Sequence, residues 1–265
     1  MSETFRDHGA TTLSYDASGE VATITLDRSA KLNALTPAML TALEEAARAA
    51  DDSDARVVVV RTAGEKVFCV GADITMFGGL TSVQMWRDWI SVGHRAFSAL
   101  EAVRCPTIAV VDGLAFGGGL ELALACDFRI MRDDARLALP ETGLGTVPGW
   151  GGTARLPALV GVSRAKEMIL ARRQIGADVA LDWGLVNDVA LAGELDACVK
   201  RWTGDIRGGG PVAVALSKQL ITAAAAGAPA SLIESIAGGM SIGTEDLVEG
   251  VAAFREKRAP EFRGR

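Results

Sequence analysis

Short apolar segments alternate with amphipathic ones along the first part of the chain. Val21–Leu26 is rich in β-branched residues, and Val57–Val60 and Thr107–Val111 are apolar at nearly every position. Runs that are apolar on both faces are typical of strands buried in a parallel sheet. The pattern therefore predicts strands at these three segments, with shorter ones at Phe128–Met131 and Arg136–Leu139.

Segments with helical periodicity lie between these strands. Thr36 offers a hydroxyl cap, and Pro37 follows it at the first helical position. The next residues, Ala38–Ala50, place their apolar side chains on one face and predict an amphipathic helix. Further helices are expected over residues 82–102 and, in a shorter form, over residues 120–125. Strands that alternate with helices imply crossover connections and a largely parallel sheet.

The pattern changes after Ser163, where helical periodicity takes over and Val186–Val189 is the one strand-like interruption. We therefore expect an α/β fold, with a core over residues 1–200 and a helical region over residues 201–265. Residues 1–9 are polar and predict a mobile tail without the apolar segment of a signal peptide. The C-terminal helices are expected at 163–171, 177–183, 194–202, 211–226, 230–238 and 244–257.

Composition narrows the classes of function. The chain has 265 residues, of which 49% are hydrophobic and 23% charged, the balance of a soluble globular protein. A net charge of −6 disfavours nucleic acid as a partner. No apolar run is long enough to span a membrane, so a cytoplasmic location is expected. The four cysteines predict buried free thiols, and two histidines, His8 and His94, are too few for a zinc site.

A glycine triplet, Gly117–Gly119, separates an apolar strand from the helix expected at Leu120. The first amides of a helix lack acceptors, and the helix dipole favours negative charge there. Glycines let a ligand approach such amides closely, so the segment suits stabilisation of an oxyanion. Close packing of helix and strand would explain the glycines equally well. Neither a dinucleotide-binding nor a Walker-type glycine pattern occurs, so NAD and ATP are not expected.

Two glutamates stand in apolar surroundings. Glu121 interrupts a helix that is otherwise leucine and alanine, and Glu141 follows Pro140 in a glycine-rich segment. Burial raises the pKa of a carboxyl toward the range useful for proton transfer, and two such groups can divide the roles of acid and base. The structural alternatives are a solvent-facing Glu121 and a Glu141 that caps a helix or turn.

Five segments of the chain form recognisable motifs: LDRSAKLNAL (Leu26–Leu35), FCVGADI (Phe68–Ile74), AVVDGLAFGGGLELALACDFRI (Ala109–Ile130), LPETGLGTVPGWGGTARLPALVG (Leu139–Gly161) and EDLVEGVAAFREKRAPEFRGR (Glu245–Arg265). Because these five motifs occur in the family's order, the chain resembles the enoyl-CoA hydratase/isomerase (crotonase) superfamily over nearly its whole length. The resemblance implies a spiral core of ββα turns followed by a helical trimerisation region, with a trimer or a dimer of trimers as the homo-oligomer.

The resemblance implies an enoyl-CoA hydratase that adds water across the 2,3-double bond of a 2-enoyl-CoA thioester. The backbone amides of Ala72 and Gly118 would form an oxyanion hole for the thioester carbonyl. Glu121 would activate the water, and Glu141 would protonate the α carbon. No metal or redox cofactor is implied, since coenzyme A is part of the substrate.

Coenzyme A itself would lie over the segment Ala30–Leu32 and the Ala72–Ile74 loop. Asp73 would otherwise cap the next helix, and the basic residues would otherwise be solvated surface charges. Thr75 stands where many relatives carry a lysine, which puts one contact in doubt. Phe254 and Lys257 would contact the adenine and phosphate portion, from this chain or a neighbouring subunit. The implied substrate-binding residues are Ala30, Lys31, Leu32, Gly71, Asp73, Ile74, Gly117, Phe254 and Lys257.

Several alternatives stay open at this point. Trp86, Trp89 and Trp150 either shorten the acyl pocket or belong to the core. A Δ3,Δ2-enoyl-CoA isomerase needs only one carboxylate, and other acyl-CoA enzymes of the family, hydrolases and lyases among them, share the scaffold. A non-catalytic relative that binds a CoA ester or RNA is less favoured, because both glutamates are present and the chain is acidic.

Overall fold

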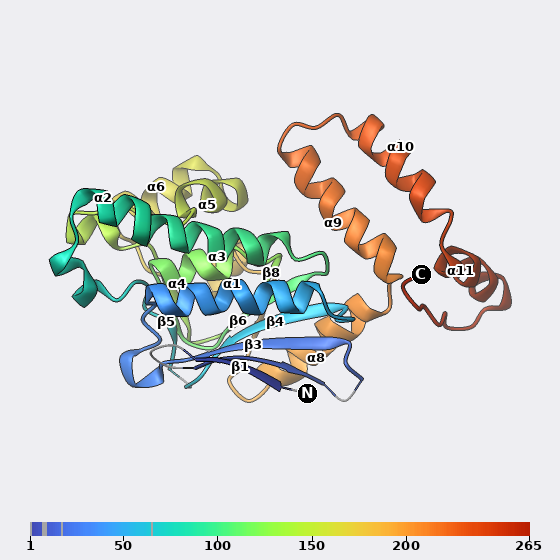
Figure 1. Cartoon of the computed structure of the whole chain (residues 1–265), viewed down its shortest axis with the longest axis horizontal. Helices are drawn as coiled ribbons and strands as arrows, with labels where there is room; N and C mark the ends of the chain where they lie inside the picture. The colour runs from blue at the N-terminus through green and yellow to red at the C-terminus, as the bar shows by residue number, and fades with distance from the viewer. Residues whose placement is uncertain (1, 7–9, 17, 65) are drawn as a thin grey trace.

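The structure is a computed structural model that describes residues 2–6, 10–16, 18–64 and 66–265. Its core contains two sheets (Figure 1). The larger sheet runs, in spatial order, β1 (Ser2–Arg6), β2 (Ala10–Tyr15), β3 (Val21–Asp27), β4 (Val57–Thr62), β6 (Thr107–Val111), β8 (Phe128–Arg132) and β11 (Asp188–Ala190). The smaller sheet runs β10 (Ile175–Gly176), β9 (Arg136–Ala138), β7 (Leu114–Phe116) and β5 (Val67–Cys69).

The largely parallel sheet predicted from the apolar runs is confirmed. Strands β3, β4, β6, β8 and β11 pair in parallel, as do β5, β7 and β9. The expectation of a mobile N-terminal tail is wrong for Ser2–Arg6, which pairs antiparallel with β2. A strand at a sheet edge is held by backbone hydrogen bonds, so it needs no apolar run that a sequence pattern would reveal. His8 lies outside the described residues.

Two helices, α1 (Pro37–Asp51) and α3 (Ser91–Ala102), pack against each other beside the larger sheet (Figure 1). Thr36 caps α1 as predicted, since its hydroxyl accepts a hydrogen bond from the amide of Met39 at 3.2 Å. The helical region expected over residues 82–102 is confirmed, although it is not α-helical throughout. There, α2 (Ser82–Gln84) leads into a π-helical turn at Met85–Ile90 before α3 begins. Apolar periodicity does not distinguish such a turn from an α-helix.

The helix α4 (Gly118–Leu124) is buried at all of its residues. It is followed by α5 (Gly152–Val160), α6 (Val162–Leu170), α7 (Ala177–Asp182) and α8 (Leu195–Arg207). The sequence did not indicate α5, because it starts among glycines and contains Pro157. Helix α8 packs on β4 and β8 and continues through residue 200, and the division of the chain there stays a prediction.

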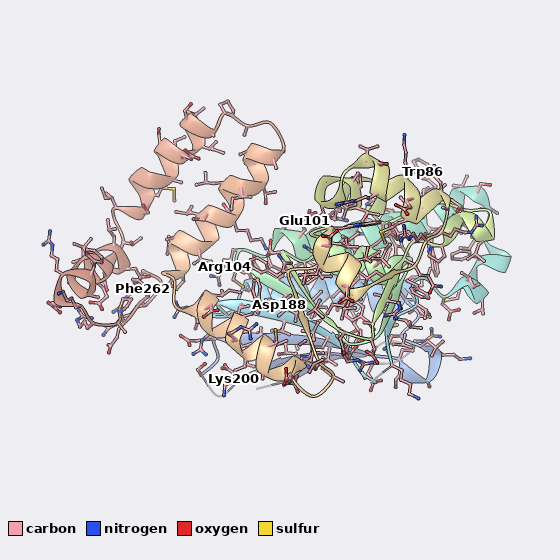
Figure 2. The ribbon with its side chains drawn as sticks, turned by 180° about the vertical axis from the view of Figure 1, so that it is seen from behind. Trp86, Glu101, Arg104, Asp188, Lys200 and Phe262 are labelled. Carbon is pink, nitrogen blue, oxygen red and sulfur yellow. The ribbon has the colours of Figure 1, made fainter. Side chains whose placement is uncertain are left out.

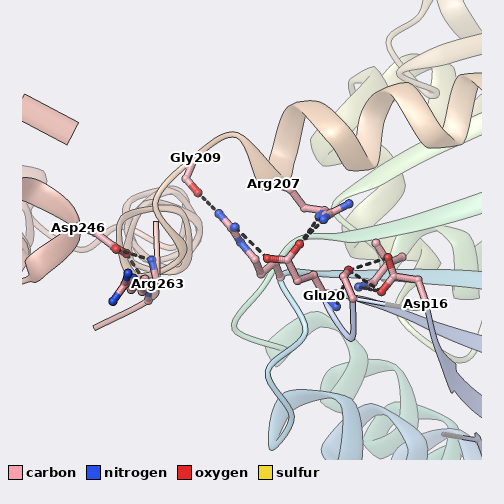
Figure 3. A network of polar contacts seen from close by, with 10 residues as sticks. Asp16, Glu20, Arg207, Gly209, Asp246 and Arg263 are labelled. Carbon is pink, nitrogen blue, oxygen red and sulfur yellow. Dashed lines mark hydrogen bonds and ion pairs between the residues drawn. The ribbon is translucent and has the colours of Figure 1, made fainter. Parts of the chain in front are cut away.

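Three helices extend away from the core: α9 (Pro211–Ala225), α10 (Ala230–Ser241) and α11 (Glu245–Glu256) (Figure 1, and from behind in Figure 2). Figure 3 shows the polar contacts at their base, where Glu20 pairs with Arg207, and the guanidinium of Arg56 donates to the Gly209 carbonyl at 2.5 Å. Beyond α11 the chain folds back, and the Gly264 amide donates to Asp246 at 2.9 Å. The arm is therefore tethered to the core at its base and closed on itself at its tip.

The prediction of buried free cysteines is confirmed for Cys69, Cys105, Cys126 and Cys198. Within the described residues, no helix is long and apolar enough to cross a membrane. The same residues include no group of three or more histidine, cysteine, aspartate or glutamate side chains placed to hold a metal ion.

Candidate active site

A cavity of about 100 Å³ opens at the N-terminus of α4. It is lined by Glu121 and Glu141 together with Ala72 and Gly118, the four residues that the resemblance places at the chemistry. The π-helical turn contributes much of the apolar wall. The large side chains of that wall are Phe77, Met85, Trp89, Ile90 and Trp150. Residues from four separate segments of the sequence thus converge on one small, mostly apolar space.

Close packing of two loops brings the two amides together. Gly71 has a φ of 96°, and a Cβ there would lie 2.9 Å from the Gly118 nitrogen. Leu35 forms a parallel bridge to Ala72, donating to the Gly71 carbonyl at 2.7 Å. This pattern turns the Ala72 N–H away from Leu35. Neither the Ala72 amide nor the Gly118 amide has an acceptor in the described part of the chain, so both are available to a ligand.

Asn33 is a residue that the sequence reasoning missed. It is buried, with a φ of 54°, and its side-chain amide donates to the carbonyls of Ala63 at 2.8 Å and Phe68 at 3.1 Å. These bonds fasten the segment before Leu35 to the strand that leads into the Ala72 loop. Asparagine tolerates left-handed backbone better than most residues, which is the signal that LDRSAKLNAL carried.

Glu121 lies on α4 and is 1% exposed, so the solvent-facing alternative is wrong. One carboxylate oxygen, Oε1, accepts hydrogen bonds from the backbone amides of Trp150 and Gly152, both at 2.8 Å. Burial raises the pKa of this carboxyl, and the two amide donors act in the opposite direction. The second oxygen accepts no hydrogen bond from the described residues and is free to contact a ligand in the cavity.

Glu141 opens a short 3-10 turn, Glu141–Leu144, but its side chain caps nothing, so the capping alternative is not what the structure shows. Its Oε2 is buried without a hydrogen-bond partner among the described residues. Burial raises the pKa of this carboxyl to about 7, and the negative charge of Glu121 adds to the effect. Gly117 has a φ of 53°, a backbone conformation that favours glycine, and a Cβ there would also come within 2.9 Å of the Glu141 Oε1.

The implied coenzyme A residues lie in several different places in the structure. Gly71, Ile74 and Gly117 line the cavity. Ala30, Lys31 and Leu32 form an exposed turn that touches the cavity loop through a 3.3 Å hydrogen bond from the Val70 amide to the Leu32 carbonyl.

Asp73 does not line the cavity, because its carboxylate pairs with Arg28 at 2.8 Å and accepts from the Thr75 amide at 3.1 Å. Hydrogen bonds from Thr75 are the largest influence that lowers its pKa. Phe254 lies in α11 and Lys257 directly after it, far from α4, whose N-terminus borders the cavity (Figure 1). Within one chain they do not meet the cavity.

Comparison with known proteins decides the family. The family described as enoyl-CoA hydratase/isomerase matches residues 16–265. The chain belongs to this family. A crotonyl-CoA hydratase of Syntrophomonas wolfei is 39% identical over 249 residues, covering 92% of this chain and 94% of that relative. A short-chain-enoyl-CoA hydratase of Clostridium acetobutylicum is 40% identical over 246 residues, with coverage of 92% and 94%.

Solved structures agree with this assignment. An enoyl-CoA hydratase from Bacillus anthracis superposes with a TM-score of 0.90 at 38% identity, covering 96% of this chain and 99% of that one. An enoyl-CoA hydratase from Geobacillus kaustophilus superposes with a TM-score of 0.92 at 29% identity, covering the whole of both chains. The expected crotonase fold and an enzyme of the enoyl-CoA hydratase type are thereby confirmed, whereas the roles of individual residues stay predictions.

Proposed function

We propose that the protein hydrates short-chain 2-enoyl-CoA thioesters, adding water across the 2,3-double bond. The observation that carries the proposal is the pair Glu121 and Glu141 in one small apolar cavity beside two unpaired amides. The names of the two relatives at about 40% identity, crotonyl-CoA hydratase and short-chain-enoyl-CoA hydratase, support the same reaction and a short acyl chain.

The amides of Ala72 and Gly118 would stabilise the thioester oxygen. Attack of water at C3 moves an electron pair through C2 to that oxygen, so negative charge develops where the two N–H groups converge. Gly118 is also the first residue of α4, where the helix dipole favours an anion. Donors aimed at such developing charge are worth about 3–4 kcal/mol each in the transition state.

The two carboxyls differ in a way that supports a division of roles. Burial raises the pKa of Glu121 as it does that of Glu141, but the two backbone hydrogen bonds that Glu121 accepts favour its ionised form, so it suits removal of a proton from water as oxygen bonds to C3. Glu141 has a pKa of about 7 and is half protonated near neutrality. It suits delivery of a proton to C2. Proton exchange with solvent then restores both groups, so water is the only species consumed with the enoyl ester.

Coenzyme A would enter over the exposed turn at Ala30–Leu32 and pass the loop at Gly71–Ile74 to the cavity. Lys31 is exposed there and suits contact with a phosphate. Phe254 is 85% exposed on α11 and remote from the cavity of its own chain. It and Lys257 would therefore contact the adenine end of coenzyme A bound to a neighbouring copy.

The helical arm also supports a homo-oligomer, a trimer or a dimer of trimers. Apolar side chains crowd its surface, and an unpaired apolar face of this kind is typical of an interface. Two copies around the arm would bury side chains that water now reaches. The most exposed of them are Ile221, Leu232, Ile236, Met240, Ile242, Val248 and Phe254, each more than half exposed.

Initial rates with crotonyl-CoA test the proposed reaction. Loss of the ultraviolet absorbance of the conjugated thioester should be rapid with the native protein. It should fall by at least a thousandfold in both Glu121→Gln and Glu141→Gln, which keep shape but remove the proton-transfer group. Rates in the two variants equal to the rate of the native protein would refute the paired catalytic roles of the two glutamates. Activity on a 3-enoyl-CoA alone would instead favour the isomerase.

A further inference from the structure

The indole ring of Trp150 fills a space that two neighbouring glycines leave open. Trp150 is 2% exposed and lines the cavity. A Cβ at Gly118 would lie 2.4 Å from one edge of its indole, and a Cβ at Gly93 would lie 2.2 Å from the other. Two glycines, on α4 and α3, are thus required for the ring to lie between these helices. The ring therefore fills the space between Gly118 on α4 and Gly93 on α3.

Other aromatic rings hold the indole in this position. Trp89 stacks on it with ring centroids 6.2 Å apart, and Phe97 meets it edge-on at 5.6 Å. Phe77 in turn packs edge-on against Trp89 at 5.1 Å. The π-helical turn at Met85–Ile90 presents Trp89 to this cluster and leaves Trp86 70% exposed. Such clusters fix a side chain tightly, because dense interiors leave few other rotamers.

The backbone of Trp150 also contacts the catalytic centre. Its amide donates to Glu121 at 2.8 Å, the same carboxylate that would direct water to C3. C3 must therefore lie near Glu121 while the thioester oxygen lies near the Gly118 amide. The indole packs against Gly118, and the amide of the same residue contacts Glu121, so the ring would lie next to C3 of a bound substrate. An acyl chain that continues past C4 in this direction meets the ring.

We infer that Trp150 sets the acyl-chain limit of this enzyme, by closing the cavity beyond C4 with a ring locked between Gly93 and Gly118. The inference rests on the proposed function and deepens it. The cavity of about 100 Å³ holds only several water volumes, which favours a short acyl group. Trp150 is thus a specificity residue whose backbone amide positions Glu121 and whose side chain limits the length of the acyl chain.

Removal of the indole should favour longer substrates. Each methylene group that a longer chain newly buries contributes about fourfold to binding, which corresponds to about 0.8 kcal/mol. Two methylene groups placed in the space vacated by Trp150→Ala should raise the preference for eight-carbon over four-carbon esters by about tenfold or more. Trp150→Phe is the matched control. It keeps an aromatic ring in this position but is smaller than indole, and the Nε1 that it loses has no hydrogen-bond partner among the described residues.

The experiment compares native protein, Trp150→Ala and Trp150→Phe by the ratio of kcat/KM for 2-octenoyl-CoA to that for crotonyl-CoA. Dissociation constants of octanoyl-CoA and butyryl-CoA, measured by calorimetry, give a second ratio that needs no turnover. We expect both ratios to rise about tenfold or more in Trp150→Ala and to change by less than about threefold in Trp150→Phe. If Trp150→Ala does not fold, Trp150→Leu replaces it. Because leucine fills part of the space of the indole, we expect a smaller rise in both ratios.

The possible outcomes distinguish a failure of the role of Trp150 from a failure of the proposed reaction. Turnover of crotonyl-CoA with unchanged ratios in a folded Trp150→Ala or Trp150→Leu would overturn the role of Trp150 and leave the hydratase intact. A shift in the binding ratio without turnover of any 2-enoyl-CoA would uphold the role of Trp150 and overturn the reaction. An equal rise in Trp150→Phe would also overturn the inference, because the ring would then not be the barrier.

Discussion

Replacement of Glu141 by glutamine should change how the stability of the protein depends on pH. The Glu141 carboxyl is half-buried, its Oε2 has no partner among the described residues, and its pKa is about 7 where the ordinary value is 4.5. Because the pKa is raised in the folded state, the favourable contribution of the neutral acid is complete below pH 4.5. It is lost as pH rises through 7.

The magnitude follows from the shift. About 2.5 pKa units correspond to about 3.4 kcal/mol as an upper bound, at 1.36 kcal/mol per unit. We expect about half of this, roughly 1.5–2 kcal/mol, because solvent reaches part of the group and screens its charge. Glutamine stays neutral at every pH. The native protein should therefore lose about this much stability relative to Glu141→Gln between pH 4.5 and pH 8.

The assay is denaturant unfolding at pH 5 and pH 8, at one protein concentration. Any effect of the glutamine side chain on the free energy of unfolding that does not depend on pH cancels when the two pH values are compared. Glu194→Gln is the matched control, since it removes an exposed carboxylate from the protein surface. Parallel pH profiles for native protein and Glu141→Gln would refute the buried state of this carboxyl, and with it the reason for assigning it the role of acid.

Three further predictions follow from the site. The kcat/KM for crotonyl-CoA should decline above about pH 7, as Glu141 loses the proton that it delivers, and a profile flat to pH 9 would contradict that role. Gly118→Ala should lower kcat/KM by more than about tenfold, because its Cβ would displace the Trp150 ring, whereas Gly238→Ala, with open space around it, should not. Asn33→Ala should lower the free energy of unfolding by about 2–4 kcal/mol. The variant leaves buried carbonyls without their hydrogen-bond donor and places alanine in a left-handed backbone conformation. A loss under about 1 kcal/mol in denaturant unfolding would refute this.

Much of the fold could be predicted because its signals are local. The strands at Val57–Thr62 and Thr107–Val111 are buried on both faces, and continuous apolar runs reveal that directly. The cap and proline at Thr36 and Pro37 likewise fix the start of α1. By contrast, Ser2–Arg6 pairs through its backbone, which leaves no apolar pattern to find.

Prediction of the site was limited by its dependence on tertiary contacts. The burial of Glu121 was suggested by the leucines and alanines around it, but its two amide donors come from residues 150 and 152, about thirty positions away. The sequence also left open whether Trp150 belonged to the core or to the pocket. The structure shows both, because the ring packs on Gly93 and lines the cavity as well.

Turnover of crotonyl-CoA in ¹⁸O-labelled water shows most directly whether the protein adds water to a 2-enoyl-CoA in this cavity. We expect a 3-hydroxyacyl-CoA product that carries one labelled oxygen at C3 with the thioester intact, and no such product from Glu121→Gln. An unlabelled isomer of the substrate, or release of free coenzyme A with the label in a carboxylic acid, would contradict it.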